Sequence, residues 1–400
     1  MGCSPVFSHL PTYAGDPIFE LVARYARDGR PDKVNLSVGI YYDDRGEVPL
    51  LECIKQAERR YLSLRSPIGY LPIEGDARYR QAVRRLVFGE DSDGSDRVTV
   101  VQTVGGSGAL KVGADFLKRV NADSRVWLSN PTWDNHVGVF TGAGFNVSRY
   151  AYYDADTQGL DFGGMVRDLR SCRRGDIVLL APCCHNPTGV DPTREQWKII
   201  LDVIEEWGSV PFIDMAYQGF ADGLDADAWL VRELVKRKMN CLVSTSFSKN
   251  FSLYGERCGS LSVYSADPGT SADVLGQLQL CIRQNYSSPP THGMALVSVV
   301  LDDAELRQLW VTELAGMRER IRAIRAQFQL TLQILVPHID SSFLLRQTGM
   351  FAYTGLREDQ INRLREQHAV YALASGRICI AGLNSSNVDH AAHAFQDVMQ

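Results

Sequence analysis

The chain has 400 residues, of which 45% are hydrophobic and 22% are charged, and its formal net charge is −5. Such a chain can bury one large core or two moderate ones, and it lacks the basic excess of a nucleic-acid-binding protein. It contains no apolar run long enough to span a membrane and no signal-peptide pattern at residues 1–16, so we expect a cytoplasmic protein without membrane or nucleic-acid partners.

Short apolar runs rich in Val, Ile and Leu occur through the middle of the chain, and they do not alternate cleanly with polar residues. This pattern is typical of parallel strands that are buried on both faces. The predicted strands span residues 97–102, 125–129, 176–181, 210–214, 241–246 and 259–264.

Amphipathic segments separate these runs. Residues 109–120 carry their apolar side chains on one helical face, which predicts a helix. Residues 192–207 predict another helix, with Asp191 as its N-cap. Strands and helices that alternate in this way indicate an α/β domain with a mostly parallel sheet and crossover helices.

The last third of the chain has fewer strand patterns and more helical ones, which predicts a smaller α+β unit that begins near residue 310 within a continuous helix. Residues 1–15 are too short to pack alone and are predicted to form an arm. The elements expected after residue 300 are a helix at 302–336, strands at 349–353 and 377–380, a helix at 357–366 and a last helix from residue 387.

The nine cysteines include no C-x-x-C pair. We therefore expect buried, reduced thiols, because a zinc site or a disulfide framework would need spacings that this sequence lacks. No metal site is predicted.

Lys249 follows a predicted apolar strand and stands among small hydroxyl residues. Parallel strands present functional groups at their carboxyl ends, and burial there lowers the pKa of a lysine. A lysine in such a place can form a Schiff base. The alternative is an ordinary surface lysine in a loop.

Asp214 ends another apolar strand, and Tyr217 follows three residues later. A carboxylate in that place can pair with a protonated pyridine nitrogen, and a nearby phenol can donate a hydrogen bond to an oxygen on the same ring. The alternative is an aspartate that caps a helix.

Glycines and arginines suited to anions occur near the other strand ends. Residues 105–108, Gly-Gly-Ser-Gly, link a predicted strand to a predicted helix and suit a phosphate. Arg257, Arg283 and Arg377 lie beside strand ends or turns, where a guanidinium binds phosphate or carboxylate through two hydrogen bonds. Each feature alone also fits a structural role, but a phosphate turn, an aspartate, a lysine and arginines on one domain indicate a pyridoxal-phosphate site.

From about residue 15 to its end, the chain resembles the aspartate and aromatic aminotransferases of pyridoxal-phosphate fold type I, and most of all their bacterial aromatic branch. The strings that carry this resemblance are Tyr-Leu-Pro-Ile-Glu-Gly (70–75), Cys-Cys-His-Asn-Pro-Thr-Gly (183–189), Ala-Tyr-Gln-Gly-Phe (216–220), Ser-Phe-Ser-Lys-Asn (246–250) and Asn-Tyr-Ser-Ser-Pro-Pro (285–290). The resemblance implies a seven-stranded, mostly parallel sheet in a large cofactor-binding domain at 46–310, and a small domain formed by 16–45 and 311–400.

The resemblance also implies pyridoxal 5′-phosphate as cofactor, attached to Lys249. Asp214, supported by His136, would hold the pyridine nitrogen, and Trp133 would stack on the ring. The residues implied for the phenolic oxygen and the phosphate are Asn186, Tyr217, Gly106, Ser107, Ser246, Arg257 and, across a subunit boundary, Tyr70. The active unit would therefore be a homodimer.

The same resemblance implies a ping-pong transfer of an amino group to 2-oxoglutarate. Arg377 would bind the substrate α-carboxylate, helped by Asn186, Trp133 and the backbone near Gly39. Arg283 of the other subunit would bind the distal carboxylate of a dicarboxylic substrate.

Fewer residues indicate whether the chain belongs to the aromatic or the aspartate branch of the family. The choices that resemble the aromatic branch are Ile40, Tyr42, Val48, Ser107 and Ser288, whereas Gly69 departs from it. The alternative within the family is an aspartate aminotransferase with little aromatic activity. Two further alternatives are a non-enzymatic binding module that has kept this fold, and an enzyme that catalyses another pyridoxal-phosphate reaction, such as decarboxylation.

Overall fold

The computed structural model describes residues 10, 15–64, 67–90, 94 and 97–400, and its centre is one seven-stranded sheet. The strands, in sheet order, are β2 (Val98–Val104), β10 (Cys258–Tyr264), β9 (Cys241–Ser246), β8 (Val210–Met215), β7 (Ile177–Leu180), β3 (Arg125–Asn130) and β4 (Asn146–Ala151). β10 is antiparallel to both of its neighbours, and the other pairs are parallel. The predicted α/β fold and all six predicted strands are confirmed.

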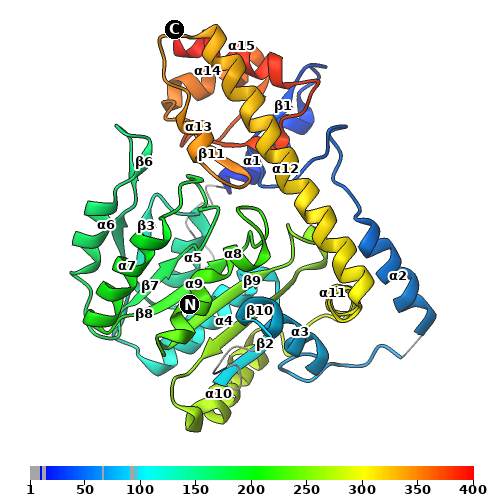
Figure 1. The fold of residues 1–400 in the computed structure, drawn as a ribbon, viewed down its shortest axis with the longest axis vertical. Helices are drawn as coiled ribbons and strands as arrows, with labels where there is room; N and C mark the ends of the chain where they lie inside the picture. The colour runs from blue at the N-terminus through cyan, green and yellow to red at the C-terminus, as the bar shows by residue number, and fades with distance from the viewer. Residues whose placement is uncertain (1–9, 11–14, 65–66, 91–93, 95–96) are drawn as a thin grey trace, which may run out of the picture.

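Helices cover both faces of this sheet (Figure 1). One apolar core lies between the sheet and α4 with its neighbours, where Leu110, Phe116 and Leu117 are buried. A larger core fills the opposite face and continues into the C-terminal part of the chain. The helices between residues 52 and 302 are α2 (Glu52–Leu64), α3 (Ala77–Phe88), α4 (Gly105–Val120), α5 (Asp134–Gly142), α6 (Phe162–Leu169), α7 (Arg194–Trp207), α8 (Leu224–Asp227), α9 (Trp229–Lys236), α10 (Ser271–Asn285) and α11 (His292–Asp302).

The C-terminal elements gather at one end of the molecule beside the first helix (Figure 1). There β1 pairs in parallel with β12, and β11 pairs antiparallel with β13. The long helix α12 runs from the sheet to this end and spans the boundary predicted near residue 310. The elements are α1 (Pro17–Arg27), β1 (Val34–Asn35), α12 (Ala304–Leu335), α13 (Phe343–Arg346), β11 (Phe351–Tyr353), α14 (Glu358–His368), β12 (Val370–Tyr371), β13 (Arg377–Cys379) and α15 (Val388–Met399).

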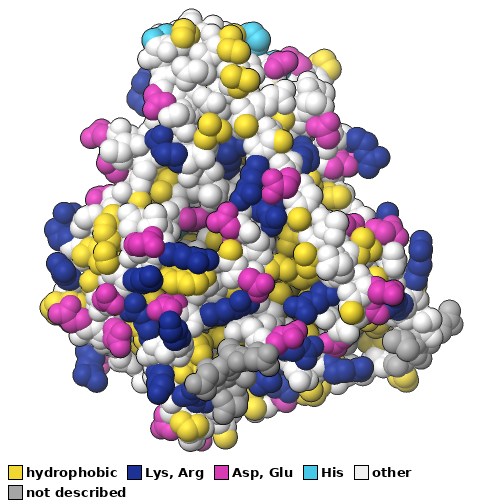
Figure 2. Space-filling view, in the orientation of Figure 1, with side chains coloured by type: hydrophobic (Ala, Val, Ile, Leu, Met, Phe, Trp, Pro, Cys, Tyr) yellow, Lys and Arg dark blue, Asp and Glu magenta, His cyan; other side chains and the backbone are white. Residues whose placement is uncertain are grey.

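Short elements complete the description. They are β5 (Tyr153–Asp154), β6 (Gly159–Leu160) and the 3₁₀ turns η2 (Tyr254–Glu256), η3 (Pro268–Thr270) and η4 (Ile380–Gly382). Basic and acidic side chains are interspersed over the face shown in Figure 2. No helix in the described part of the chain is both long and apolar enough to cross a membrane.

Two local predictions were wrong. α4 begins at Gly105, so the glycine-rich segment forms its first turn rather than a link before it. α7 is capped by Thr193 in a reciprocal capping box with Gln196, and the carboxylate predicted to cap it, on Asp191, binds elsewhere. The arm predicted at residues 1–15 lies outside the described residues, except for positions 10 and 15.

Candidate active site

A cavity of about 280 Å³ opens at the carboxyl ends of β2, β8 and β9. β8 and β9 lie side by side there, so Asp214 and the segment that carries Lys249 reach the same edge of the sheet. Eleven of the predicted site residues line the cavity: Gly39, Gly106, Ser107, Trp133, Asn186, Asp214, Tyr217, Ser246, Lys249, Arg257 and Arg377.

Asp214 is oriented by a buried histidine. The Nε2 atom of His136 lies 3.1 Å from Asp214 Oδ2, and its Nδ1 atom lies 2.8 Å from Thr132 Oγ1. Trp133 packs edge-on against the His136 ring, with centroids 5.2 Å apart. The carboxylate is therefore fixed at one end of the cavity with an oxygen available to a cationic partner.

Lys249 lines the same cavity as this carboxylate. Its Nζ atom is 5.1 Å from the centroid of the Tyr217 ring. Burial lowers the pKa of Lys249 from its usual 10.5 to about 8, although the charge of Asp214 opposes this shift. Its amine is consequently much closer to neutral near physiological pH than a surface lysine, as a nucleophile or general base requires.

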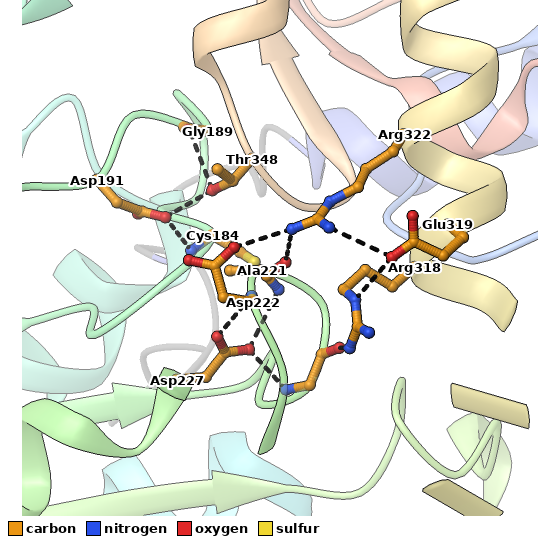
Figure 3. Close-up of polar contacts among 11 residues, drawn as sticks. Cys184, Gly189, Asp191, Ala221, Asp222, Asp227, Arg318, Glu319, Arg322 and Thr348 are labelled. Carbon is orange, nitrogen blue, oxygen red and sulfur yellow. Dashed lines mark hydrogen bonds and ion pairs between the residues drawn. The ribbon is translucent and has the colours of Figure 1, made fainter. Parts of the chain in front are cut away.

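The loop that follows Tyr217 is fixed by charged groups on both sides (Figure 3). The buried carboxylate of Asp227 accepts hydrogen bonds from the backbone N–H groups of Gly219, Ala221 and Asp222, at 2.7–3.1 Å. From α12, Arg318 donates to the Gly219 carbonyl oxygen at 3.1 Å. This support fixes the backbone of the loop directly after Tyr217, whose side chain lines the cavity.

The N-terminus of α4 has a geometry that suits an anion. Gly105 has φ +67°, and a Cβ atom there would lie 2.7 Å from Arg257 Nη2. A Cβ on Gly106 would lie 3.0 Å from Ser246 Cβ. Arg257 donates to Ser248 Oγ at 3.2 Å and to the Tyr254 carbonyl oxygen at 3.0 Å. A helix N-terminus without side chains beside a guanidinium suits a phosphate.

Arg377 is 3% exposed and held by neutral acceptors. It donates to Asn186 Oδ1 at 3.0 Å and to the Ser37 carbonyl oxygen at 2.6 Å, and its guanidinium lies 4.4 Å from the Phe351 ring centroid. Its buried Nε has no hydrogen-bond partner among the residues that the structure describes. Burial lowers the pKa of Arg377, so a carboxylate in the cavity would relieve an uncompensated charge.

Some predicted residues are not brought together by the single chain. Tyr70 is 98% exposed, and Arg283 lies exposed on α10, where it donates to Ser287 Oγ. Neither lines the cavity. The substrate-branch residues that also lie outside this lining are Ile40, Tyr42, Val48, Gly69 and Ser288.

The apolar lining comes from residues that sequence reasoning missed: Ile18, Phe19, Val38, Leu110 and Phe351. Four of them come from the first helix, the segment after β1 and the strand β11, which are distant in sequence from the lysine strand. No local motif marks them. A family alignment against a structure would be the signal able to find them.

The cavity fits pyridoxal phosphate by its own chemistry. It contains a glycine cradle beside Arg257, a carboxylate backed by His136 and an amine with a lowered pKa. These groups match the phosphate, the pyridine nitrogen and the aldehyde of the cofactor.

Comparisons with known proteins agree with this chemistry. The family model described as aminotransferase class I and II matches residues 31–395. The chain is 48% identical to the aromatic-amino-acid aminotransferase of Escherichia coli (strain K12), covering 98% of this chain and 100% of the relative. It is 47% identical to an aspartate aminotransferase of Pseudomonas aeruginosa, with the same coverage.

A solved structure shares both fold and cofactor chemistry. It is an aromatic-amino-acid aminotransferase from Burkholderia pseudomallei, covalently bound to pyridoxal phosphate. Its TM-score is 0.97 at 46% identity, over 99% of this chain and 100% of that one. The chain therefore belongs to the class I and II aminotransferases and is a pyridoxal-phosphate-dependent transaminase.

Proposed function

We propose that the chain transfers amino groups from aromatic amino acids and from aspartate to 2-oxoglutarate by a ping-pong reaction. Relatives with aromatic and with aspartate names are almost equally identical to the chain, at 48% and 47%, so identity does not separate the two substrates. The observation that carries the proposal is the apolar lining, contributed by Ile18, Phe19, Val38, Leu110 and Phe351, in the same cavity as the Arg377 guanidinium. Such a cavity suits a substrate with a carboxylate and a ring.

Arg377 and the backbone near Gly39 would bind the α-carboxylate end of the substrate. Arg377 would hold the α-carboxylate, while Asn186, Phe351 and the Ser37 carbonyl oxygen keep its guanidinium in place. A Cβ on Gly39 would lie 2.8 Å from the Phe351 ring, so this position needs a glycine to leave the backbone accessible. Trp133 would cover the reacting centre from one side.

The cofactor would be held by residues at both ends of the cavity. Its phosphate would bind Gly106, Ser107, Ser246 and Arg257, and its ring oxygen would bind Asn186 and Tyr217. Asp214 would keep its pyridine nitrogen protonated, with His136 behind. When bound, the cofactor supplies an electron-poor ring that accepts the electrons of the Cα–H bond.

Lys249 has two roles in this proposal. It would attach the cofactor, and once free its neutral amine would take the proton from Cα and return it on the other side of the transferring nitrogen. The lowered pKa of Lys249 favours both roles near neutral pH.

The first prediction concerns that pKa. We expect Lys249 in the apoenzyme to capture pyridoxal phosphate at a rate that rises with pH and levels off above about 8, because only the neutral amine attacks the aldehyde. Stopped-flow absorbance from about pH 6 to about pH 10 measures this rate. A free amine such as Nα-acetyl-lysine is the control, and a rate that still rises steeply at the highest pH would contradict the prediction.

We also propose that the active unit is a homodimer. The side chain of Tyr70 is 98% exposed in the single chain, and the nearby Ile68 and Leu62 are 77% and 66% exposed. Large apolar side chains this exposed and this close in sequence favour a protein partner. Tyr70 would bind the phosphate of the neighbouring subunit, and Arg283 would bind the distal carboxylate of a dicarboxylic substrate across the same interface.

Three further features belong to the proposal. Residues 46–310 would form the large domain, and 16–45 with 311–400 the small one, which the β1–β12 pairing and the path of α12 support. Ile40, Tyr42, Val48 and Ser288 would act at the pocket rim of the assembled dimer. The enzyme would work in the cytoplasm.

The proposal is tested by steady-state kinetics with 2-oxoglutarate as acceptor. We expect the kcat/KM values for phenylalanine, tyrosine and aspartate to differ by no more than about a hundredfold, because one cavity serves all three. Turnover of aspartate with almost none of the aromatic substrates would favour the alternative, an aspartate aminotransferase. Valine and lysine serve as controls for a non-selective pocket.

A further inference from the structure

The carboxylate of Asp191 has an unexpected set of partners. It does not cap α7, and instead its Oδ2 atom accepts from the Cys184 N–H at 2.7 Å and from the Thr348 hydroxyl at 2.6 Å. Its Oδ1 atom accepts from the His185 N–H at 2.9 Å. Figure 3 shows Asp191 and Thr348 facing each other across this contact.

The donors come from two segments far apart in sequence. Cys184 and His185 immediately precede Asn186, whereas Thr348 lies three residues before Phe351. A second contact joins the same segments, because the Thr348 N–H donates to the Gly189 carbonyl oxygen at 2.6 Å. One carboxylate thus ties the loop with a predicted cofactor ligand to the strand that lines the substrate end of the cavity.

Two glycines let these segments approach closely. Gly189 has φ +69°, and a Cβ there would lie 2.7 Å from the Phe351 carbonyl oxygen. Gly349 has φ +71°, and a Cβ there would lie 2.5 Å from Cys184 Cβ. The contact is therefore backbone against backbone, and a small displacement of one segment moves the other.

A buried arginine also holds the segment from Thr348 to Phe351. Arg325 of α12 is 4% exposed and donates to the carbonyl oxygens of Gly349 at 2.7 Å, Phe351 at 2.8 Å and Leu344 at 3.3 Å. The segment from Thr348 to Phe351 is consequently clamped between Asp191 and Arg325.

Both clamped segments touch Arg377. The Oδ1 atom of Asn186 accepts from its Nη1 atom at 3.0 Å, and the Phe351 ring centroid lies 4.4 Å from its guanidinium carbon. Phe351 also packs edge-on against Tyr217, with centroids 5.7 Å apart. The direction in which the guanidinium points therefore depends on the register between the two segments.

We propose that Asp191 and Thr348 are positioning residues, and that the hydrogen bond between them sets the orientation of Arg377 for the substrate carboxylate. This inference rests on the proposed role of Arg377. Neither residue lines the cavity, so each acts through Asn186 and Phe351 rather than by contact with substrate.

The test compares two substitutions of Thr348 in the pyridoxal-phosphate holoenzyme. Thr348→Val keeps the shape and removes the hydroxyl, whereas Thr348→Ser keeps the hydroxyl. Isothermal titration calorimetry measures the Kd of two unreactive carboxylates, succinate and 3-phenylpropionate. We expect Thr348→Val to weaken binding of both by roughly fivefold to tenfold, and Thr348→Ser to stay within about twofold of the wild type.

The thermal midpoint of each variant separates positioning from stability. A Thr348→Val enzyme that has a lower midpoint but binds both carboxylates as the wild type does would overturn the inference, as would a Thr348→Ser enzyme that binds as poorly as Thr348→Val. If Thr348→Val fails to fold, Asp191→Asn is measured in its place, with the same loss of affinity expected and unchanged affinity overturning the inference.

Binding to the wild-type enzyme separates a failure of the proposed function from a failure of this inference. A wild-type holoenzyme that binds neither carboxylate would contradict the proposed role of Arg377, and with it this inference. A wild type that binds succinate alone would contradict only the aromatic half of the proposed function, and the comparison of Thr348 variants would then be read from succinate.

Discussion

Replacing Lys249 with alanine is expected to lower kcat for transamination by at least about 10³-fold, because the substitution removes both the covalent anchor and the general base. The residue lines the cavity beside Asp214 and Tyr217, and it is the one lysine among the described residues that line it. The measurement is kcat for aspartate with saturating 2-oxoglutarate, together with borohydride reduction followed by mass spectrometry to detect the covalent link.

Lys198→Ala provides the matched control, since Lys198 is exposed on α7 and far along the chain from the lysine strand. That variant should keep normal turnover and be labelled at Lys249. Near-normal turnover by the Lys249→Ala enzyme, or a reduced cofactor attached to another lysine, would refute the assignment.

Replacing Arg377 with leucine should lower kcat/KM by roughly 10²- to 10³-fold for every amino-acid substrate, because the α-carboxylate is common to all of them and would lose a buried charged partner. Arg377→Lys should fall between this variant and the wild type, since lysine keeps the charge but not the planar fork. The measurement is kcat/KM for aspartate and for phenylalanine in both variants.

Arg167→Leu controls for the loss of an arginine, because the Arg167 side chain is 73% exposed on α6. It should leave both kcat/KM values unchanged. A loss in Arg377→Leu that is confined to aspartate would instead mean that Arg377 binds a distal carboxylate, and the proposed orientation of the substrate would have to be reversed.

The sheet was predictable wherever a strand is buried on both faces. Residues 241–246 were predicted with the observed bounds of β9, in which every side chain is buried. β4 was missed because it is an edge strand that pairs only with β3, and Asn146, Ser148 and Arg149 interrupt its apolar character. An edge strand needs fewer apolar residues, so apolar content alone does not reveal it.

Local propensity misled the prediction at two helix starts. Gly105 and Gly106 have low helix propensity, yet they begin α4. Glycine occupies these positions because Arg257 and Ser246 leave no room for a Cβ. Asp191 precedes a proline and resembles an N-cap, but its partner Thr348 lies 157 residues away. A contact so distant in sequence leaves no local pattern from which it can be read.

The residues of the candidate site also fall into those that strand ends predict and those that depend on contacts distant in sequence. Lys249, Asp214 and the α4 glycine Gly106 were predicted to lie together because strand ends in one sheet meet at one edge, and all three line the cavity. Phe351 and Phe19 were missed because β11 and α1 reach the cavity only through the packing of the C-terminal elements. The positions expected to act across a subunit boundary, Tyr70 and Arg283, are tested only by an assembled dimer.

The central claim is that one cavity accepts both aromatic and dicarboxylic amino acids, and a half-reaction tests it most directly. The purified pyridoxal-phosphate enzyme is mixed rapidly with phenylalanine in one experiment and with aspartate in another, while the visible absorbance of the bound cofactor is followed. Rapid, stoichiometric bleaching by both amino acids, with release of the matching oxo acids, is the predicted result. Bleaching by aspartate alone, or by neither, would contradict the claim.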